Sequence, residues 1–235
     1  MVYNALQLLF PCHCLLCLAP SHHRQELCAA CRDELPWLGH CCLRCALPLN
    51  SPDARLCGHC LRRPPRFEHC LSALRYQFPC DQLLVNFKYH RQLASGRLLA
   101  QLWLQHCRDP AGSHRPQLLV PIPLHWRRRW TRGYNQSLLL AQHWGDALSL
   151  PVCSALRRGR HTPPQQGLNA AQRRRNLRDA FTLQHPSSIN GRHIAVVDDV
   201  LTTGTTANAA AAILLAAGAR RVDIWCLART PEPGQ

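Results

Sequence analysis

The sequence predicts an α/β fold in which helices cover both faces of a parallel sheet, preceded by a small cysteine-rich block. Apolar strand-like runs alternate with helix-like segments throughout residues 71–228, which is the pattern of a parallel sheet with crossover helices. Ten of the fifteen cysteines lie between Cys12 and Cys60, ahead of that region. We therefore expect two domains, a metal-binding domain at residues 1–66 and an α/β domain at residues 67–235.

The cysteine-rich block contains four Cys-x-x-Cys pairs. Each pair forms a tight turn that presents two thiolates to one tetrahedral metal, so two pairs complete the coordination. The N-terminus lacks the basic region and cleavage site of a signal peptide, and in a cytoplasmic chain clustered cysteines favour metal thiolates over disulfides. We expect two structural zinc sites, whose ligands are Cys14, Cys17, Cys28, Cys31, Cys42, Cys45, Cys57 and Cys60.

Spacing alone does not fix which pairs share a metal. Sequential pairing joins the first pair to the second and the third to the fourth, whereas a cross-braced arrangement interleaves them. We favour sequential pairing because short loops cost less entropy to close. Cys12 and Cys41 lie beside the pairs as spare thiols, although Cys12 could substitute for Cys14.

The formal net charge of +15 marks a basic chain. Two sites of four thiolates each, with their zinc ions, lower this balance to roughly +11. A basic surface favours phosphorylated ligands or nucleic acid as partners. No apolar run is long enough to cross a bilayer, so we expect no membrane span and a cytoplasmic location.

The α/β domain is expected to follow a stiff, basic boundary at residues 62–66. Its first elements are a strand at residues 71–78 and one or two helices at residues 81–106. Lys88, the only lysine, lies in this helical segment, as a solvated residue or as a ligand contact. The later elements expected are a strand at residues 118–124, a helix at 135–147, a strand near 152–156, a helix ending at Gly218 and a strand at 221–228.

Two basic segments can bind anions. Residues 125–136 hold four arginines and two tryptophans directly after the strand at residues 118–124, and arginine forks suit diphosphate oxygens. Residues 157–175 form a long basic segment with two prolines. A segment of this length inside a compact domain is more often a lid than a connector.

The most informative stretch is residues 194–206. Four apolar residues predict a buried strand, and its carboxyl end is where open α/β sheets place their ligands. Asp198 and Asp199 follow as acceptors for sugar hydroxyls or a hydrated magnesium ion. The next residues supply hydroxyls and backbone N–H groups at a helix N-terminus, which favours an anion. A phosphorylated sugar fits both halves.

This stretch resembles the 5-phosphoribosyl-1-pyrophosphate (PRPP) motif of the type I phosphoribosyltransferases. The resemblance implies that Asp198 and Asp199 hold the ribose of PRPP, which binds with magnesium. It also implies a 5′-phosphate loop formed by Thr202, Thr203, Gly204, Thr205 and Thr206. Purine-salvage members keep an acid at the position of Thr202, so salvage of hypoxanthine or guanine is disfavoured.

The order of motifs along the whole chain is similar to that of the ComF family, which includes ComFC competence proteins and GntX-type proteins. The motifs are the cysteine pairs, Val120–Leu124, Arg132–Gln136, Thr162–Gln165 and the PRPP motif. The resemblance implies a double zinc ribbon joined to a type I phosphoribosyltransferase fold, and a role in natural transformation or in using external DNA. It assigns Arg128, Arg132 and Gly133 to the pyrophosphate side, and Thr162, Gln165 and Arg173 to a flexible hood.

Three functions stay open at this point. The first is a phosphoribosyltransferase, a glycosyltransferase of the pentosyl class, for which neither an acceptor base nor a general base can be identified. The second is a component of DNA uptake that binds PRPP or a related phosphoribosyl ligand, with single-stranded DNA and a helicase-like ATPase as partners. The third is a PRPP-sensing regulator, which ranks last because no helix-turn-helix is recognisable. We favour the second.

Overall fold

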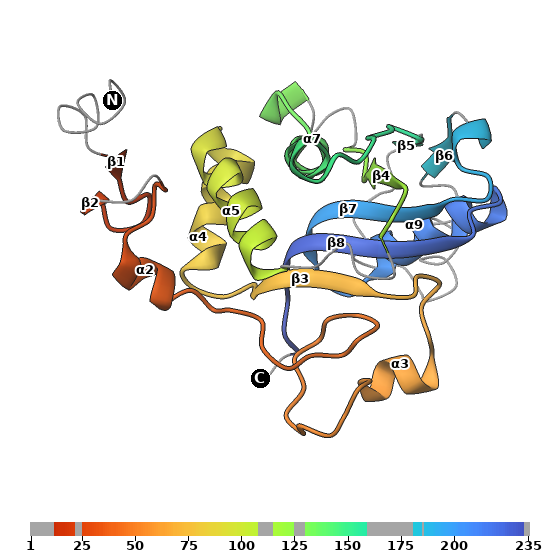
Figure 1. Cartoon of the computed structure of the whole chain (residues 1–235), viewed down its shortest axis with the longest axis horizontal. Helices are drawn as coiled ribbons and strands as arrows, with labels where there is room; N and C mark the ends of the chain where they lie inside the picture. The colour runs from red at the N-terminus through yellow and green to blue at the C-terminus, as the bar shows by residue number, and fades with distance from the viewer. Residues whose placement is uncertain are drawn as a thin grey trace.

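A four-stranded parallel sheet forms the centre of the structure (Figure 1). The computed structural model describes residues 12–21, 25–107, 115–124, 130–158, 181–184 and 186–232. In spatial order the strands are β3 (Cys70–Arg75), β8 (Arg221–Arg229), β7 (His193–Leu201) and β4 (Leu118–Pro121). The predicted α/β fold with a parallel sheet is confirmed.

Helices cover both faces of this sheet. One face carries α4 (Cys80–Tyr89), α5 (Leu93–His106) and α7 (Gln136–Leu148), and the other carries α9 (Thr205–Ala216). Because successive strand residues point to opposite faces, Val196 packs in the cluster that contains α9, while Ala195 and Val197 pack in the other cluster. The predicted helical segment at residues 81–106 is therefore two helices, α4 and α5, on one face.

One predicted strand lies at a different position. We expected it near residues 152–156, but there Val152 makes only a single bridge to Leu119 of β4. The strand β5 (Leu156–Arg158) instead forms an antiparallel hairpin with β6 (Phe181–Leu183), outside the main sheet. A short 3₁₀ turn, η1 (Pro186–Ser188), leads from the hairpin to β7. An apolar run does not reveal which neighbour satisfies its backbone groups, so the pattern could not predict this partner.

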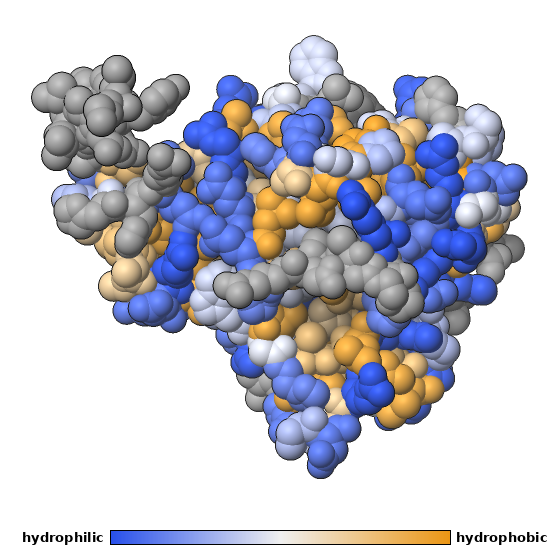
Figure 2. All heavy atoms as spheres, viewed as in Figure 1, coloured by the Kyte–Doolittle hydropathy of each residue, from blue (hydrophilic) through white to orange (hydrophobic). Residues whose placement is uncertain are grey.

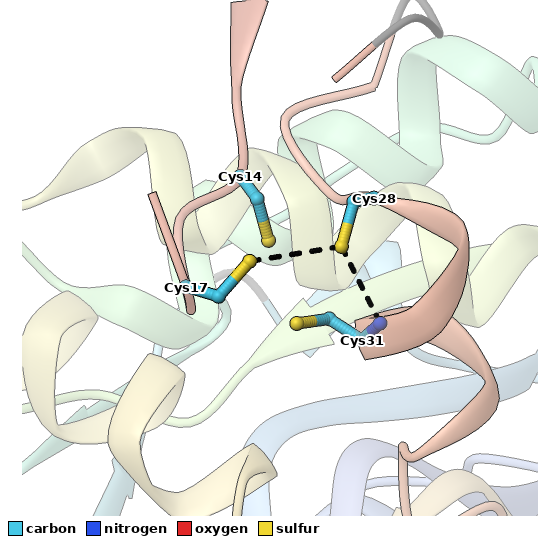
Figure 3. Close-up of side chains that lie close together, drawn as sticks. All are labelled: Cys14, Cys17, Cys28 and Cys31. Carbon is cyan, nitrogen blue, oxygen red and sulfur yellow. Dashed lines mark hydrogen bonds between the residues drawn. The ribbon is translucent and has the colours of Figure 1, made fainter. Parts of the chain in front are cut away.

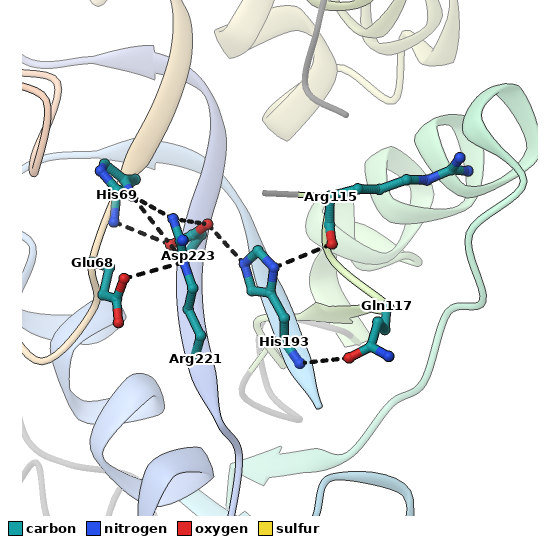
Figure 4. Close-up of polar contacts among 7 residues, drawn as sticks. All are labelled: Glu68, His69, Arg115, Gln117, His193, Arg221 and Asp223. Atoms are coloured by element: carbon teal, nitrogen blue, oxygen red, sulfur yellow. Dashed lines mark hydrogen bonds and ion pairs between the residues drawn. The ribbon is translucent and has the colours of Figure 1, made fainter. Parts of the chain in front are cut away.

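A polar cluster fixes the amino ends of β7 and β8 (Figure 4). His193 is buried, and its Nε2 lies 2.8 Å from Asp223 Oδ2 while its Nδ1 lies 3.2 Å from the carbonyl oxygen of Arg115. Arg221 Nη2 lies 3.1 Å from Asp223 Oδ2, and its Nε lies 3.3 Å from Glu68 Oε2. Burial alone would raise the pKa of Asp223, but the hydrogen bonds from His193 and Arg221 outweigh it and lower that pKa. The cluster therefore joins two strands at the end opposite to Asp198.

The cysteine-rich block folds around two small metal-binding units. The elements of the first are β1 (Cys12–His13), β2 (Pro20–Ser21) and α2 (Ala29–Asp33), which lie beside α4, and the second includes α3 (Gly58–Arg62), below the sheet in Figure 1. The segment between them extends the sheet at β3. The N–H of Leu38 donates to the carbonyl of Ala73 at 2.8 Å, and the N–H of Arg75 donates to that of Pro36 at 2.8 Å. This pairing covers an edge strand that would otherwise be open.

The surface over α3 is partly hydrophobic, as the orange spheres in the lower part of Figure 2 show. Leu61 of α3 is 67% exposed, and Leu43 of the same unit is also exposed. No helix within the described residues combines the length and apolar character needed to cross a membrane.

Candidate functional site

The two acidic residues of the candidate site lie near the carboxyl end of β7. Asp198 Oδ1 accepts hydrogen bonds from Ser137 Oγ at 3.1 Å and from the backbone N–H of Asp199 at 2.9 Å. Asp199 Oδ2 forms an ion pair with Lys88 Nζ at 3.1 Å, and both side chains are largely buried. Three elements therefore meet here: β7 supplies the acids, α7 a hydroxyl and α4 a cation.

The environment of Asp198 disfavours its charged form. Burial, and then the negative charge of Asp199, raise its pKa from 3.8 to about 7, while hydrogen bonds and the charge of Lys88 act in the opposite direction. In the unfolded chain the pKa returns to its ordinary value. The folded state therefore binds more protons between about pH 4 and pH 7, and stability falls as the pH rises through that window.

Asp198→Asn should therefore stabilise the ligand-free chain at pH 8 and change its stability little at pH 5. At pH 5 the folded-state carboxyl is already protonated, whereas at pH 8 the amide replaces a charged group that costs folding free energy. We expect a gain of about 1 kcal/mol or more at pH 8. Thermal unfolding at both pH values measures it, with Asp146→Asn at an exposed residue of α7 as control. A gain of equal size at both pH values would contradict this explanation.

The predicted phosphate loop is separated from the acidic pair by only two residues. Gly204 has a φ of +73°, a left-handed conformation that favours glycine, and α9 begins at the next residue. Thr203 Oγ1 and Thr205 Oγ1 lie 2.7 Å apart at the exposed start of the helix. The predicted loop residues Thr202, Thr203, Gly204, Thr205 and Thr206 are thus contiguous at a helix N-terminus, where backbone N–H groups favour an anion.

The segment predicted to hold pyrophosphate lies before α7. The guanidinium of Arg132 lies 4.6 Å from the ring centre of Tyr89, and Gly133 has a φ of +86°. Tyr134 donates a hydrogen bond from its hydroxyl to the carbonyl of Phe87, which joins this segment to α4. Arg128 lies outside the described residues, as do the predicted hood residues Thr162, Gln165 and Arg173.

A cleft of about 850 Å³ opens between this segment and the β5–β6 hairpin. Its lining is both apolar and polar, and includes Pro121, Leu124, Gly133, Tyr134, Asn135, Leu156, Arg157, Arg158 and Thr182. Its volume falls within the range of small-molecule sites. Asn135 lines the cleft and caps α7, the helix that carries Ser137, the hydrogen-bond partner of Asp198.

Two residues of the site were not assigned a role from the sequence. The sequence left Lys88 open between a solvated residue and a ligand contact, and the structure places it on Asp199. Ser137 was missed altogether. It is 61 residues from Asp198, and the residues around it predict only the start of a helix. A single lysine among 27 arginines was the one available signal for Lys88.

The eight predicted zinc ligands form two groups of four cysteines. Within each group the sulfur atoms all lie within 4.8 Å of one another: Cys14, Cys17, Cys28 and Cys31 form the first cysteine group, and Cys42, Cys45, Cys57 and Cys60 form the second cysteine group. Sequential pairing is therefore confirmed, and Cys12 belongs to neither group. Figure 3 shows the four side chains of the first cysteine group pointing toward a common centre.

The distances within these groups suit zinc. The sulfur atoms of Cys17 and Cys28 are 3.7 Å apart, and those of Cys45 and Cys57 are 3.6 Å apart. Zn–S bonds of about 2.3 Å in tetrahedral geometry require a separation of about 3.8 Å. In each group a backbone N–H also approaches a sulfur atom. The N–H of Cys31 lies 3.5 Å from Cys28 Sγ, and the N–H of Cys60 lies 3.4 Å from Cys57 Sγ. These contacts stabilise thiolate ligands.

Elemental analysis of the purified chain should return about two zinc ions per chain. Cys14→Ser combined with Cys17→Ser should reduce that value to about one, because it removes half of the ligands of the first cysteine group only. Inductively coupled plasma mass spectrometry on protein quantified by amino-acid analysis gives the ratio. A value near one for the unmutated chain would refute the two-site assignment.

Comparison with known proteins agrees with this architecture. Residues 5–61 match the double zinc ribbon domain, and residues 135–234 match the phosphoribosyl transferase domain. The chain is 38% identical over 227 residues to the DNA utilization protein YhgH of Salmonella typhi, covering 92% of this chain and 96% of that protein. It is 34% identical over 229 residues to competence protein F of Haemophilus influenzae, covering 94% and 98%.

Among solved structures, adenine phosphoribosyltransferase from Leishmania tarentolae aligns over 61% of this chain and 74% of that chain, at 14% identity and a TM-score of 0.39. The relatives above, in contrast, match along nearly their whole length, across both the cysteine groups and the sheet. With a double zinc ribbon followed by a phosphoribosyl transferase domain, the chain belongs to the ComF family.

Proposed function

We propose that this ComF-type protein binds PRPP, or a related phosphoribosyl ligand, together with magnesium in the cytoplasm. We further propose that it acts in DNA uptake during natural transformation or in the utilization of external DNA. The observation that carries the first part is the acidic pair Asp198–Asp199, followed after two intervening residues by a threonine- and glycine-rich loop at the N-terminus of α9. The names of the relatives, which refer to competence and to DNA utilization, support the second part.

The chemistry of the ligand matches the two halves of the site. Ribose hydroxyls donate hydrogen bonds, and the carboxylates of Asp198 and Asp199 accept them. Magnesium keeps part of its water shell and binds to carboxylate and phosphate oxygens, so the same pair can hold the hydrated ion that accompanies PRPP. The 5′-phosphate then takes the N–H groups and hydroxyls of residues 202–206. Arg132, beside the cleft, supplies positive charge for the pyrophosphate.

Single-stranded DNA and a helicase-like ATPase are the proposed macromolecular partners. Trp130, 84% exposed beside Arg132, can stack on a base, and the formal charge of +15 suits a polyanion. The exposed apolar side chains Leu43 and Leu61 on the second ribbon provide an area where a protein partner can dock.

An active phosphoribosyltransferase is the second candidate, and the cleft of about 850 Å³ beside the segment before α7 favours it. In such a reaction the bond from C1 of PRPP to pyrophosphate breaks, and a nucleophile from the acceptor bonds to C1 and loses its proton. The chain would hold the pyrophosphate, neutralise its charge and exclude water. Thr202 stands where an acid serves the base in purine salvage, so the acceptor would differ.

Parallel titrations with PRPP, nucleotides and single-stranded DNA across salt concentrations separate these functions. Tight magnesium-dependent PRPP binding, together with DNA binding that weakens steeply with salt, supports the role in DNA uptake. Release of pyrophosphate on addition of an acceptor base supports the transferase. Failure of the chain to bind PRPP at any salt concentration refutes the proposed pocket.

A further inference from the structure

Arg229, the last residue of β8, is a buried cation that donates to backbone carbonyls. Its Nη1 lies 3.0 Å from the carbonyl oxygen of Leu201 and 2.6 Å from that of Thr202, and it also donates to the carbonyl of Thr230. Its Nε lies 2.9 Å from the carbonyl oxygen of Cys45. Among the described residues no carboxylate forms an ion pair with it. Among the described residues its charge is therefore not neutralised by an ion pair.

These carbonyls belong to two different parts of the candidate site. Thr202 begins the phosphate loop, and Cys45 is one of the ligands of the second cysteine group. The side chain of Arg229 thus bridges the proposed zinc site and the proposed phosphate site, although Cys45 lies 184 residues before Arg229 in the sequence.

The orientation of the peptide bonds gives this bridge a direction. In a trans peptide the C=O and the following N–H point in opposite directions. Because the carbonyl of Thr202 points at Arg229, the N–H of Thr203 points away from Arg229. A cation on the carbonyl polarises that peptide and strengthens its N–H as a donor.

Other contacts attach the same loop to the cysteine-rich block and the residues directly after it. The backbone N–H of Arg66 donates to Asn208 Oδ1 of α9 at 2.6 Å. A side chain at Gly204 would meet the ring of Phe67 at 3.9 Å. Leu201 belongs to the same buried cluster as the four cysteines of the second group. The inner side of the loop therefore rests on that block, and Arg229 is the charged part of the contact.

We propose that Arg229 is a positioning residue that couples the second cysteine group to the phosphate loop. A metal in that group fixes the carbonyl of Cys45, the guanidinium holds that carbonyl together with those of Leu201 and Thr202, and the loop keeps its N–H groups directed at the 5′-phosphate. The coupling acts in both directions, so weakening the contacts of Arg229 also weakens metal binding by the second cysteine group. The effect on ligand affinity rests on the phosphoribosyl function proposed above.

The test variant is Arg229→Lys, which keeps the positive charge but removes the planar guanidinium group. The matched control is Arg221→Lys. Arg221 is the first residue of the same strand and contacts Asp223 and Glu68 at the opposite end of the sheet (Figure 4). Calorimetry with ribose 5-phosphate and magnesium measures the phosphate site. Amide hydrogen exchange of residues 202–208 measures the loop without any ligand. Zinc release to a chromogenic chelator, followed over time, measures the two cysteine groups.

For Arg229→Lys we expect affinity for ribose 5-phosphate to fall about tenfold, the size of one lost charge-assisted hydrogen bond. We also expect faster exchange in the loop and faster release of one of the two zinc ions, with all three quantities unchanged in Arg221→Lys. Wild-type exchange and wild-type zinc release in Arg229→Lys, or equal changes in both variants, would overturn the coupling. If the unmutated chain does not bind ribose 5-phosphate, the proposed function fails, and loop exchange and zinc release still decide the coupling.

Discussion

Asp198→Asn combined with Asp199→Asn should abolish magnesium-dependent binding of PRPP. The two carboxylates are the acceptors for the ribose hydroxyls and the hydrated ion, and each amide replaces a charged acceptor by a neutral one. The loss of two charge-assisted interactions lowers affinity by about 100-fold or more. The fold should survive, because an asparagine oxygen can still accept the N–H of residue 199 and the hydroxyl of Ser137 at position 198, and Lys88 Nζ at position 199. Isothermal calorimetry measures the change.

The control for this double variant removes the same number of charges elsewhere. Asp146 of α7 and Glu232 near the C-terminus are both exposed, so Asp146→Asn combined with Glu232→Gln alters net charge equally without touching the acidic pair. PRPP affinity should stay at the wild-type value in this control. Wild-type affinity in the Asp198/Asp199 variant would refute the site assignment.

Cys42→Ser combined with Cys45→Ser should destabilise the whole α/β sheet, and not only the zinc ribbon. Cys42 is fully buried and lies in the same apolar cluster as Val196 of β7 and Ala211 of α9. A structural zinc site contributes on the order of 10 kcal/mol to folding, comparable to the entire stability of a typical domain. We therefore expect loss of cooperative thermal unfolding, or a transition lowered by tens of degrees, in circular dichroism.

The first cysteine group provides the comparison for this result. Cys14 is fully buried, as Cys42 is, but Cys17 is exposed, and Cys28 and Cys31 are only partly buried. Cys14→Ser with Cys17→Ser should therefore leave a cooperative transition for the sheet. Equal losses of stability from the two double variants would show that the two groups contribute alike, contrary to their difference in burial.

The sequence predicted those parts of the structure that depend on local patterns. Alternating strand and helix segments indicated the parallel sheet, because each apolar run must find a covered face. The Cys-x-x-Cys spacing predicted the eight ligands and, through loop entropy, their sequential pairing. The acidic pair and the loop up to Thr206 lie within one strand–turn–helix unit, so their placement beside one another follows from the chain itself.

The remaining features depend on contacts between distant segments. Lys88 reaches Asp199 only because α4 packs beside β7's carboxyl end, and Arg229 reaches Cys45 only because the second ribbon packs beneath the sheet. The strand expected near residues 152–156 failed for the same reason, since β5 pairs with β6 rather than with the sheet. No periodicity in the sequence encodes such partners. The domain boundary at residue 66 stays a prediction.

The central claim is that the carboxyl end of β7 and the start of α9 form a phosphoribosyl site. Titration of the zinc-loaded, unmutated chain with PRPP, in the presence and absence of magnesium, tests it most directly. We predict saturable binding of one PRPP per chain that requires magnesium and that ribose 5-phosphate competes for. Absence of binding with magnesium present, from a chain shown to be folded and to carry its zinc, would contradict it.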